Sequence, residues 1–104
     1  MLDLSFSFTG KCWLWHGGKA AWHFISLPQD KSEEIKYFNE NMHEKIRGWG
    51  AVRVQVTIGS TSWETSIFPS LELKAYILPI KAEVRKKEKI AVGNDVQVKL
   101  KINI

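Results

Sequence analysis

Polar and apolar residues alternate along much of this chain, and the alternation predicts β-strands. The first such segment is Leu2–Thr9, in which every second residue is leucine or phenylalanine, the pattern of a half-buried strand. It continues through Cys12–Trp15 to the glycine pair at 17–18, which predicts a hairpin with a return strand over 20–27. Pro28 should end that strand, because proline has no N–H for the sheet ladder.

The period then changes from two residues to that of a helix. Asp30 is a good N-cap residue, and Glu33 stands at the spacing of a capping box. Gly48 supplies a stop signal. Between these signals lies one apolar stripe at helical spacing, formed by Ile35, Phe38, Met42 and Ile46. This is the one long helix that the sequence predicts.

The rest of the chain returns to the alternating pattern. Turn residues and prolines divide it into further strands and one short helix. The predicted strands are Val52–Ile58, Ser62–Phe68 (closed by Pro69), Leu73–Leu78 (stopped by Pro79) and Val96–Ile104, and the short helix is Ala82–Ile90.

Two parts of the chain repeat one order of elements. A strand ends in Leu-Pro at 27–28 and again at 78–79, and each time a helix, a glycine and an alternating strand follow. Short strands with tight turns favour a small closed barrel of about six strands, because closure removes exposed strand edges. We therefore predict a mostly β barrel with one long and one short α-helix and an internal strand–helix–strand pseudo-repeat. Residues 1–104 should form this single domain.

Composition narrows the class of protein further. The chain has 104 residues, 44% of them hydrophobic and 25% charged, which is typical of one globular domain. No apolar run approaches the ~20 residues of a membrane span, and no basic region with an apolar block indicates a signal peptide. Cys12 is the single cysteine, so no internal disulfide can form. We expect a cytoplasmic protein that is a monomer or weak dimer and has no membrane partner.

The segment LPIKAEVRKKEKIAVGNDVQVKL is similar to the strand–proline–helix–Gly-Asp signature of AbrB/MazE-type swapped-hairpin proteins, whose fold is the double-split β-barrel. A wider pattern, comprising WHFISLP, RGWGAVRVQVTIG, WETSIFP, YILPIKAEVRKK and VGNDVQV, resembles the bacterial family called domain of unknown function nineteen-hundred-and-five. That resemblance covers nearly the whole chain. It implies a double-split barrel, and the family has no established activity to transfer. Asn94 splits the usual Gly-Asp pair, but Gly93 still supplies the turn.

The charge of the chain is concentrated near its C-terminal end. The formal net charge is +4, and the region from Lys81 to Lys101 holds seven basic and three acidic residues. Basic side chains there could contact nucleic-acid phosphates. Those candidates are Lys81, Arg85, Lys86, Lys87 and Lys89. The alternative is a solvated helix face on which Glu83 and Lys87 form an ion pair.

Aromatic residues provide the other candidate site. The chain has five tryptophans, and in a domain this small most should contribute to the core, Trp22 among them. A solvent-facing tryptophan beside arginine would suit a small-molecule or anion pocket. We expect such a groove to be lined by Arg47, Trp49, Arg53 and Trp63.

Metal and catalytic signals are weak. A metal site needs three or four converging ligands, and Cys12, His16, His23 and His43 follow no CxxC or HxxxH spacing. Cys12 is expected to be a small buried residue. Nothing resembles a GxSxG, Walker or dinucleotide motif. We therefore predict no metal or cofactor and a non-catalytic binding or interaction module for an unknown small molecule or protein, with nucleic-acid binding as the alternative.

Overall fold

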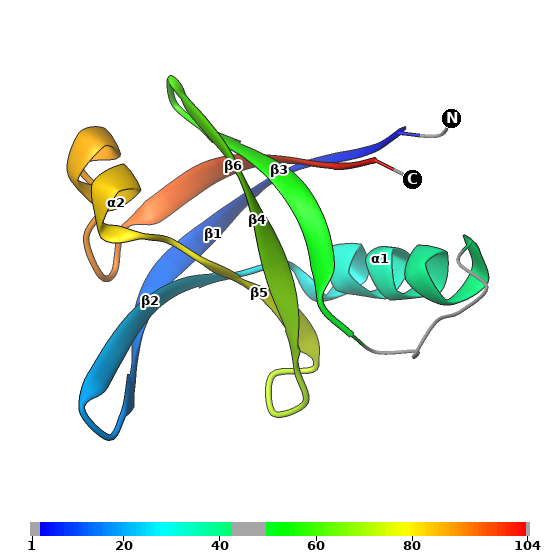
Figure 1. Cartoon of the computed structure of the whole chain (residues 1–104), viewed down its shortest axis with the longest axis horizontal. Helices are drawn as coiled ribbons and strands as arrows, with labels where there is room; N and C mark the ends of the chain where they lie inside the picture. Colours follow the sequence, from blue (N-terminus) through cyan, green and yellow to red (C-terminus); the bar gives the residue numbers. More distant parts are fainter. Residues whose placement is uncertain (1–2, 43–49, 104) are drawn as a thin grey trace.

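The computed structural model describes residues 3–42 and 50–103. Six strands close into a barrel in the order β1-β2-β5-β4-β3-β6, and every neighbouring pair is antiparallel (Figure 1). The elements are β1 (Asp3–Gly17), β2 (Ala20–Ser26), α1 (Gln29–Met42), β3 (Val52–Ile58), β4 (Thr61–Ser70), β5 (Ala75–Pro79), α2 (Ala82–Glu88) and β6 (Asp95–Asn103). The predicted mostly β barrel with one long and one short helix is confirmed.

The internal repeat determines how the barrel is assembled. The two strands of each strand–helix–strand unit, β2 with β3 and β5 with β6, are not neighbours, because β4 and one strand of the other unit lie between them. Equivalent strands pair instead, β2 with β5 and β3 with β6. Ser26 and Ile77, which each precede a Leu-Pro pair, lie directly opposite one another. Val56 lies opposite Leu100 in the second pairing. This is the arrangement of a double-split barrel.

The inward positions of the strands fill the core. Along β3 the valines and Ile58 are buried while Arg53 and Gln55 are exposed, as the period of two requires. Ile25 and Leu78 are fully buried at the centre of the β2–β5 pairing. Each such side chain stabilises the fold by about 1.5–3 kcal/mol relative to exposure.

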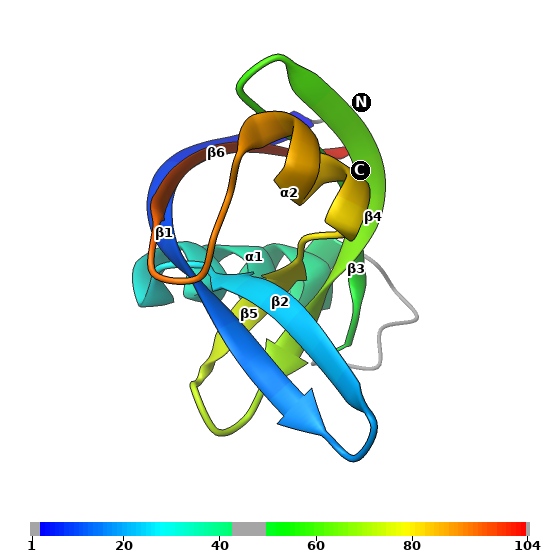
Figure 2. The same cartoon turned by 90° about the vertical axis from the view of Figure 1, so that its left-hand side faces the viewer.

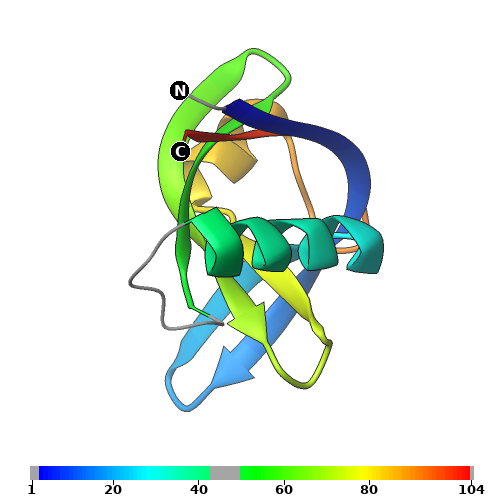
Figure 3. The same ribbon diagram turned by 90° about the vertical axis from the view of Figure 1, so that its right-hand side faces the viewer.

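The two helices lie at opposite ends of the barrel (Figures 1, 2 and 3). α1 packs against β5, where the buried Ser32 hydroxyl accepts a 3.0 Å hydrogen bond from the Tyr76 amide. Ile35 is a buried apolar residue of this helix. Among the described residues no helix is both long and apolar enough to cross a membrane.

Strand β1 is long because it belongs to two parts of the sheet. It pairs with β6 up to Lys11 and with β2 from Cys12 onwards. At this crossing a Cβ on Gly10 would meet the Ile25 side chain at 2.5 Å and the Ser26 carbonyl oxygen at 3.0 Å. Glycine therefore allows the close approach of β1 and β2 that closes the barrel.

Several predicted boundaries were wrong, and α2 ends at Glu88, two residues before its predicted end. α1 begins at Gln29, so Asp30 lies in its first turn and is not the N-cap residue. β4 continues through Pro69 to Ser70, which is possible because β3 pairs with β4 only as far as Ile67. The residues at 71–74 form the turn before β5, which starts two residues later than expected. The predicted helix stop at 48 lies outside the described residues.

Candidate functional site

The outer face of the barrel changes character along β1. Where β1 pairs with β6, its outward residues are Ser5, Ser7 and Thr9. Where it pairs with β2, the outward positions are Trp13 and Trp15. One half of the barrel thus has the polar outer face expected of a small β protein, and the other half carries large apolar side chains on its outer face. A second apolar face on a sheet marks a surface that contacts something other than the core.

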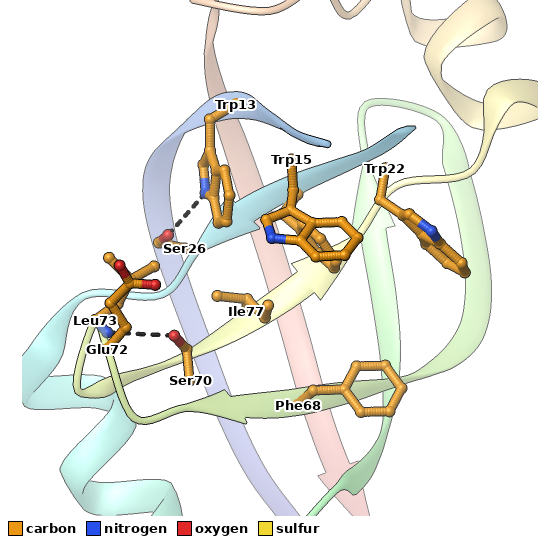
Figure 4. Close-up of a pocket in the computed structure, with 10 residues that line it drawn as sticks. Trp13, Trp15, Trp22, Ser26, Phe68, Ser70, Glu72, Leu73 and Ile77 are labelled. Carbon is orange, nitrogen blue, oxygen red and sulfur yellow. Dashed lines mark hydrogen bonds between the residues drawn. The ribbon is translucent and has the colours of Figure 1, made fainter. Parts of the chain in front are cut away.

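This second apolar face is hollowed into a cleft of about 790 Å³, within the ~300–1,000 Å³ of small-molecule sites. The cleft lies between the β1–β2 hairpin and the β4–β5 hairpin, which project from the same side of the barrel (Figures 1 and 4). We call it the aromatic cleft. Its ten lining residues are Trp13, Trp15, Trp22, Phe24, Ser26, Phe68, Ser70, Glu72, Leu73 and Ile77.

Cross-strand pairing places four of these aromatic rings on one wall. Trp13 lies opposite Phe24, and Trp15 lies opposite Trp22. The ring centroids of Trp13 and Phe24 are 5.3 Å apart with the planes tilted by 37°, while Trp22 stacks on Phe24 at 6.3 Å. The Trp13 indole Nε1–H donates a 2.9 Å hydrogen bond to Ser26 Oγ (Figure 4). Such contacts hold the wall in shape without a ligand.

The indole of Trp15 lies over a glycine. A Cβ built on Gly17 would overlap the Trp15 six-membered ring, so only a residue without a side chain allows this ring position. Because Gly17 lies two positions after Trp15 in the same strand, both belong to the outer face. The neighbouring Gly18 has a different role: its φ of 61° forms the turn, and nothing lies within 4 Å of a Cβ there.

The opposite wall and the floor come from β4 and β5. Phe68, Ile77 and Ser26 form one row across three strands, because Phe68 pairs with Ile77 and Ile77 with Ser26. At one end of the cleft, Ser70 Oγ accepts a 3.2 Å hydrogen bond from the Leu73 amide. Glu72 is exposed in the β4–β5 turn and is the one ionisable residue in the lining, as far as residues 3–42 and 50–103 show. The lining offers no nucleophile with a base beside it, so its chemistry is that of binding.

The groove expected from the sequence is not assembled from the residues that the structure describes. Arg53 is exposed on the outer face and lies 3.6 Å from the Glu64 carboxylate. Trp63 lies opposite the fully buried Val56 and packs against the core from inside. Arg53 and Trp63 therefore lie on opposite faces of one sheet. Arg47 and Trp49 fall outside the described residues.

Trp22 was wrongly expected in the core. It is 52% exposed, and Trp15 opposite it is 47% exposed. The sequence does carry a signal for the cleft, although no cleft was predicted from it. Cys12–Trp15 and Trp22–Leu27 are almost continuously apolar, whereas β3 and β6 alternate strictly. Loss of alternation in a strand of a one-layer barrel indicates that both of its faces are apolar.

The basic residues in and around α2 differ in their surroundings. Arg85 Nε donates a 3.2 Å hydrogen bond to the Ile80 carbonyl, so its guanidinium is part of the fold. Lys81 lies 3.8 Å from Glu83, which replaces the expected pairing of Glu83 with Lys87. Lys86, Lys87 and Lys89 are exposed.

Cys12 and His23 lie on the opposite side of the hairpin from the cleft wall. Cys12 is buried, as expected, and burial raises the pKa of its thiol, with Arg85 opposing that shift. Burial and the positive charge of Arg85 lower the pKa of His23. His16 is exposed, and His43 lies outside the described residues. Within the described ranges no three His, Cys, Asp or Glu residues converge as metal ligands would.

Comparison with known proteins supports the family but assigns no activity. The model of the family "Domain of unknown function (DUF1905)" matches residues 8–100, which include most of the barrel core and every described residue that lines the aromatic cleft. The chain therefore belongs to the DUF1905 family. A search of curated proteins found no match for this chain.

Proposed function

We propose that this DUF1905 protein is a non-catalytic binding module that holds a small, largely apolar ligand in the aromatic cleft. The observation that carries the proposal is the contrast between the two outer faces of one barrel. Ser7 pairs with Lys99, and Thr57 pairs with Lys99 from the other side, so that face is solvated. The face bearing Trp15 and Trp22 instead exposes large aromatic rings around a cavity.

Exposed aromatic rings in a cavity are unfavourable in water, and covering them releases free energy. Apolar area contributes roughly 25 cal/mol per Å² when it is removed from water. Trp15, Trp22 and Phe68 are each more than two-fifths exposed, which leaves this area available to a ligand. The hydrogen bond between Trp13 and Ser26 fixes part of the wall in advance, so less side-chain entropy is lost on binding.

The indole N–H resonances provide a direct test. Each tryptophan gives one such signal in a ¹⁵N–¹H correlation spectrum, and single Trp→Phe variants assign them. Neutral one- and two-ring aromatic compounds, added to millimolar concentration, should shift the signals of Trp15 and Trp22 saturably. The signal of Trp63, which packs against the core, serves as the internal control. The proposal would be contradicted if no compound shifted the signals of Trp15 and Trp22 saturably.

Nucleic-acid binding is a second candidate, favoured by the exposure of Lys86, Lys87 and Lys89 around the C-terminal end of α2. Phosphate contacts of this kind weaken steeply with salt. The variant that tests them is Lys86→Gln/Lys87→Gln, since Arg85 is bonded within the fold. DNA binding that is lost in this variant and weakened by salt would support this candidate. Equal binding by the variant and the wild type would exclude it.

A further inference from the structure

The charge at the rim of the aromatic cleft narrows the class of ligand. The chain carries a net charge of +4, yet the described residues that line the cleft include no lysine or arginine, and Glu72 is the one charged side chain among them. An organic anion would meet this carboxylate without a compensating cation. A cation would be attracted to it.

The aromatic walls of the cleft also favour a positively charged ligand. The face of an indole ring is the strongest cation-binding surface among the aromatic side chains. Trp13, Trp15 and Trp22 project into the cleft from the β1–β2 hairpin, and Phe68 projects from β4 on the far side (Figure 4). Glu72 lies in the turn at one end of this array. Aromatic faces beside a carboxylate form a cage suited to an ammonium group.

The cleft offers few polar groups to a highly polar ligand. The Trp13 indole N–H is donated to Ser26 Oγ, and Ser70 Oγ accepts the Leu73 amide N–H. Each of the two serine oxygens thus already accepts one hydrogen bond from the protein, which leaves its O–H and one lone pair. An alkylated ammonium group needs no hydrogen-bond donor or acceptor from its site, whereas a sugar or a polar neutral ligand needs several.

We infer that the ligand of the aromatic cleft is an organic cation of small-molecule size, an alkylated ammonium group joined to an apolar body. This inference rests on the proposed function, because it requires that the cleft bind a small molecule. It adds the charge of that molecule and assigns Glu72 and the three tryptophans as the groups that recognise it.

Two ligands of the same shape distinguish the cation inference from the proposed function on which it rests. Phenyltrimethylammonium and tert-butylbenzene differ only in the exchange of N⁺ for carbon. Each compound is titrated into the wild-type protein, and its binding is followed by the shifts of the indole N–H signals. We expect the cation to bind about threefold to thirtyfold more tightly, the range of a cation–π contribution. The cation is more strongly hydrated in water than the hydrocarbon, which disfavours its binding. Tighter binding of the cation would therefore show that the cleft attracts the positive charge.

The outcomes distinguish the two claims. Tighter binding of the cation supports the inference. If tert-butylbenzene binds as tightly or more tightly, the cation claim is wrong while the cleft remains a binding site. If neither compound shifts the signals of Trp15 and Trp22, both the cation claim and the proposed function are wrong.

Variants show whether the local carboxylate or the net charge is responsible. Glu72→Gln should weaken phenyltrimethylammonium binding about twofold to fivefold, the range of an exposed charge pair, and leave tert-butylbenzene unchanged. Glu83→Gln removes the same charge from α2, away from the cleft, and should change neither affinity. Equal effects of the two variants would contradict a role for Glu72.

Discussion

Ser26 and Ile77 lie directly opposite one another in the β2–β5 pairing, and both line the floor of the aromatic cleft. Each precedes a Leu-Pro pair, so the centre of the internal repeat coincides with the candidate site. The two residues differ, and only Ser26 accepts the Trp13 indole N–H. The repeat thus builds a symmetric scaffold, while unequal outward side chains make an asymmetric cleft on it.

The contact between Trp15 and Gly17 gives the first prediction. Gly17→Ala should force the Trp15 ring out of its position and weaken ligand binding, with little effect on stability, because the site is at the exposed end of the hairpin. The matched change is Gly18→Ala, which should cost about 1 kcal/mol of stability from its left-handed φ and leave the cleft intact. Urea unfolding and ligand titration of both variants check this pair. Unchanged binding by Gly17→Ala, together with weakened binding by Gly18→Ala, would contradict the described position of Trp15.

A second prediction separates the two faces of β2. Trp22→Leu should lower the free energy of unfolding by about 1 kcal/mol or less, since the side chain is on the outer face. Ile25→Ala, three residues later on the inner face, should cost about 2–5 kcal/mol. Denaturant unfolding of the two variants provides the comparison. A larger loss for Trp22→Leu than for Ile25→Ala would place Trp22 in the core after all.

A third prediction concerns how α2 is attached to the barrel. Glu88 accepts hydrogen bonds from Thr61 and Ser60 in the β3–β4 turn, where Gly59 leaves room for its carboxylate. Thr61→Val keeps the shape of the side chain, removes the donor and should destabilise the fold by about 1–2 kcal/mol. The control is Thr57→Val, whose hydroxyl bonds Ser62 at an exposed position and should cost less. Similar losses for both variants in urea unfolding would show that Glu88 adds nothing to the attachment.

The lowered pKa of His23 gives a pH dependence. Burial first, and then the charge of Arg85, disfavour the protonated imidazole in the folded state. The unfolded chain therefore binds a proton more readily, and stability should fall as the pH drops below the ordinary histidine value of 6.5. Urea unfolding between pH 7.5 and 5, for the wild type and His23→Gln, should show a weaker dependence in the variant. A His23 ring signal that titrates above 6.5 by NMR would contradict the assigned direction.

Much of the fold could be predicted from local pattern. Strand Val52–Ile58 is confirmed at both ends, because strict alternation and flanking glycines leave one register that buries the valines. Pro69 was misjudged because a proline can remain in a strand where the neighbouring strand has already ended, and this depends on long-range pairing. The order of the strands around the barrel was not predicted, because it depends on pairing between repeat units that are far apart in the sequence.

The aromatic cleft was not predicted, although the apolar runs at 12–15 and 22–27 indicate a second apolar face. Its walls come from two hairpins that meet only because β2 pairs with β5 across the repeat. From the sequence, Trp22 was indistinguishable from a core residue, since an apolar run does not show which of its residues face inward. The β1–β2 register pairs Trp22 with Trp15 and so places both rings on the outer face. Glu72 had no signal of its own, as its role depends on the turn that carries it to the cleft.

The most direct test of the central claim is the titration of ¹⁵N-labelled wild-type protein with phenyltrimethylammonium, followed by its five indole N–H signals. The account predicts saturable shifts of Trp15 and Trp22, a smaller shift of Trp13, whose N–H is bonded to Ser26, and none of Trp63. Equal shifts at all five positions, or no shift at Trp15 and Trp22, would contradict the assignment of the aromatic cleft as the binding site.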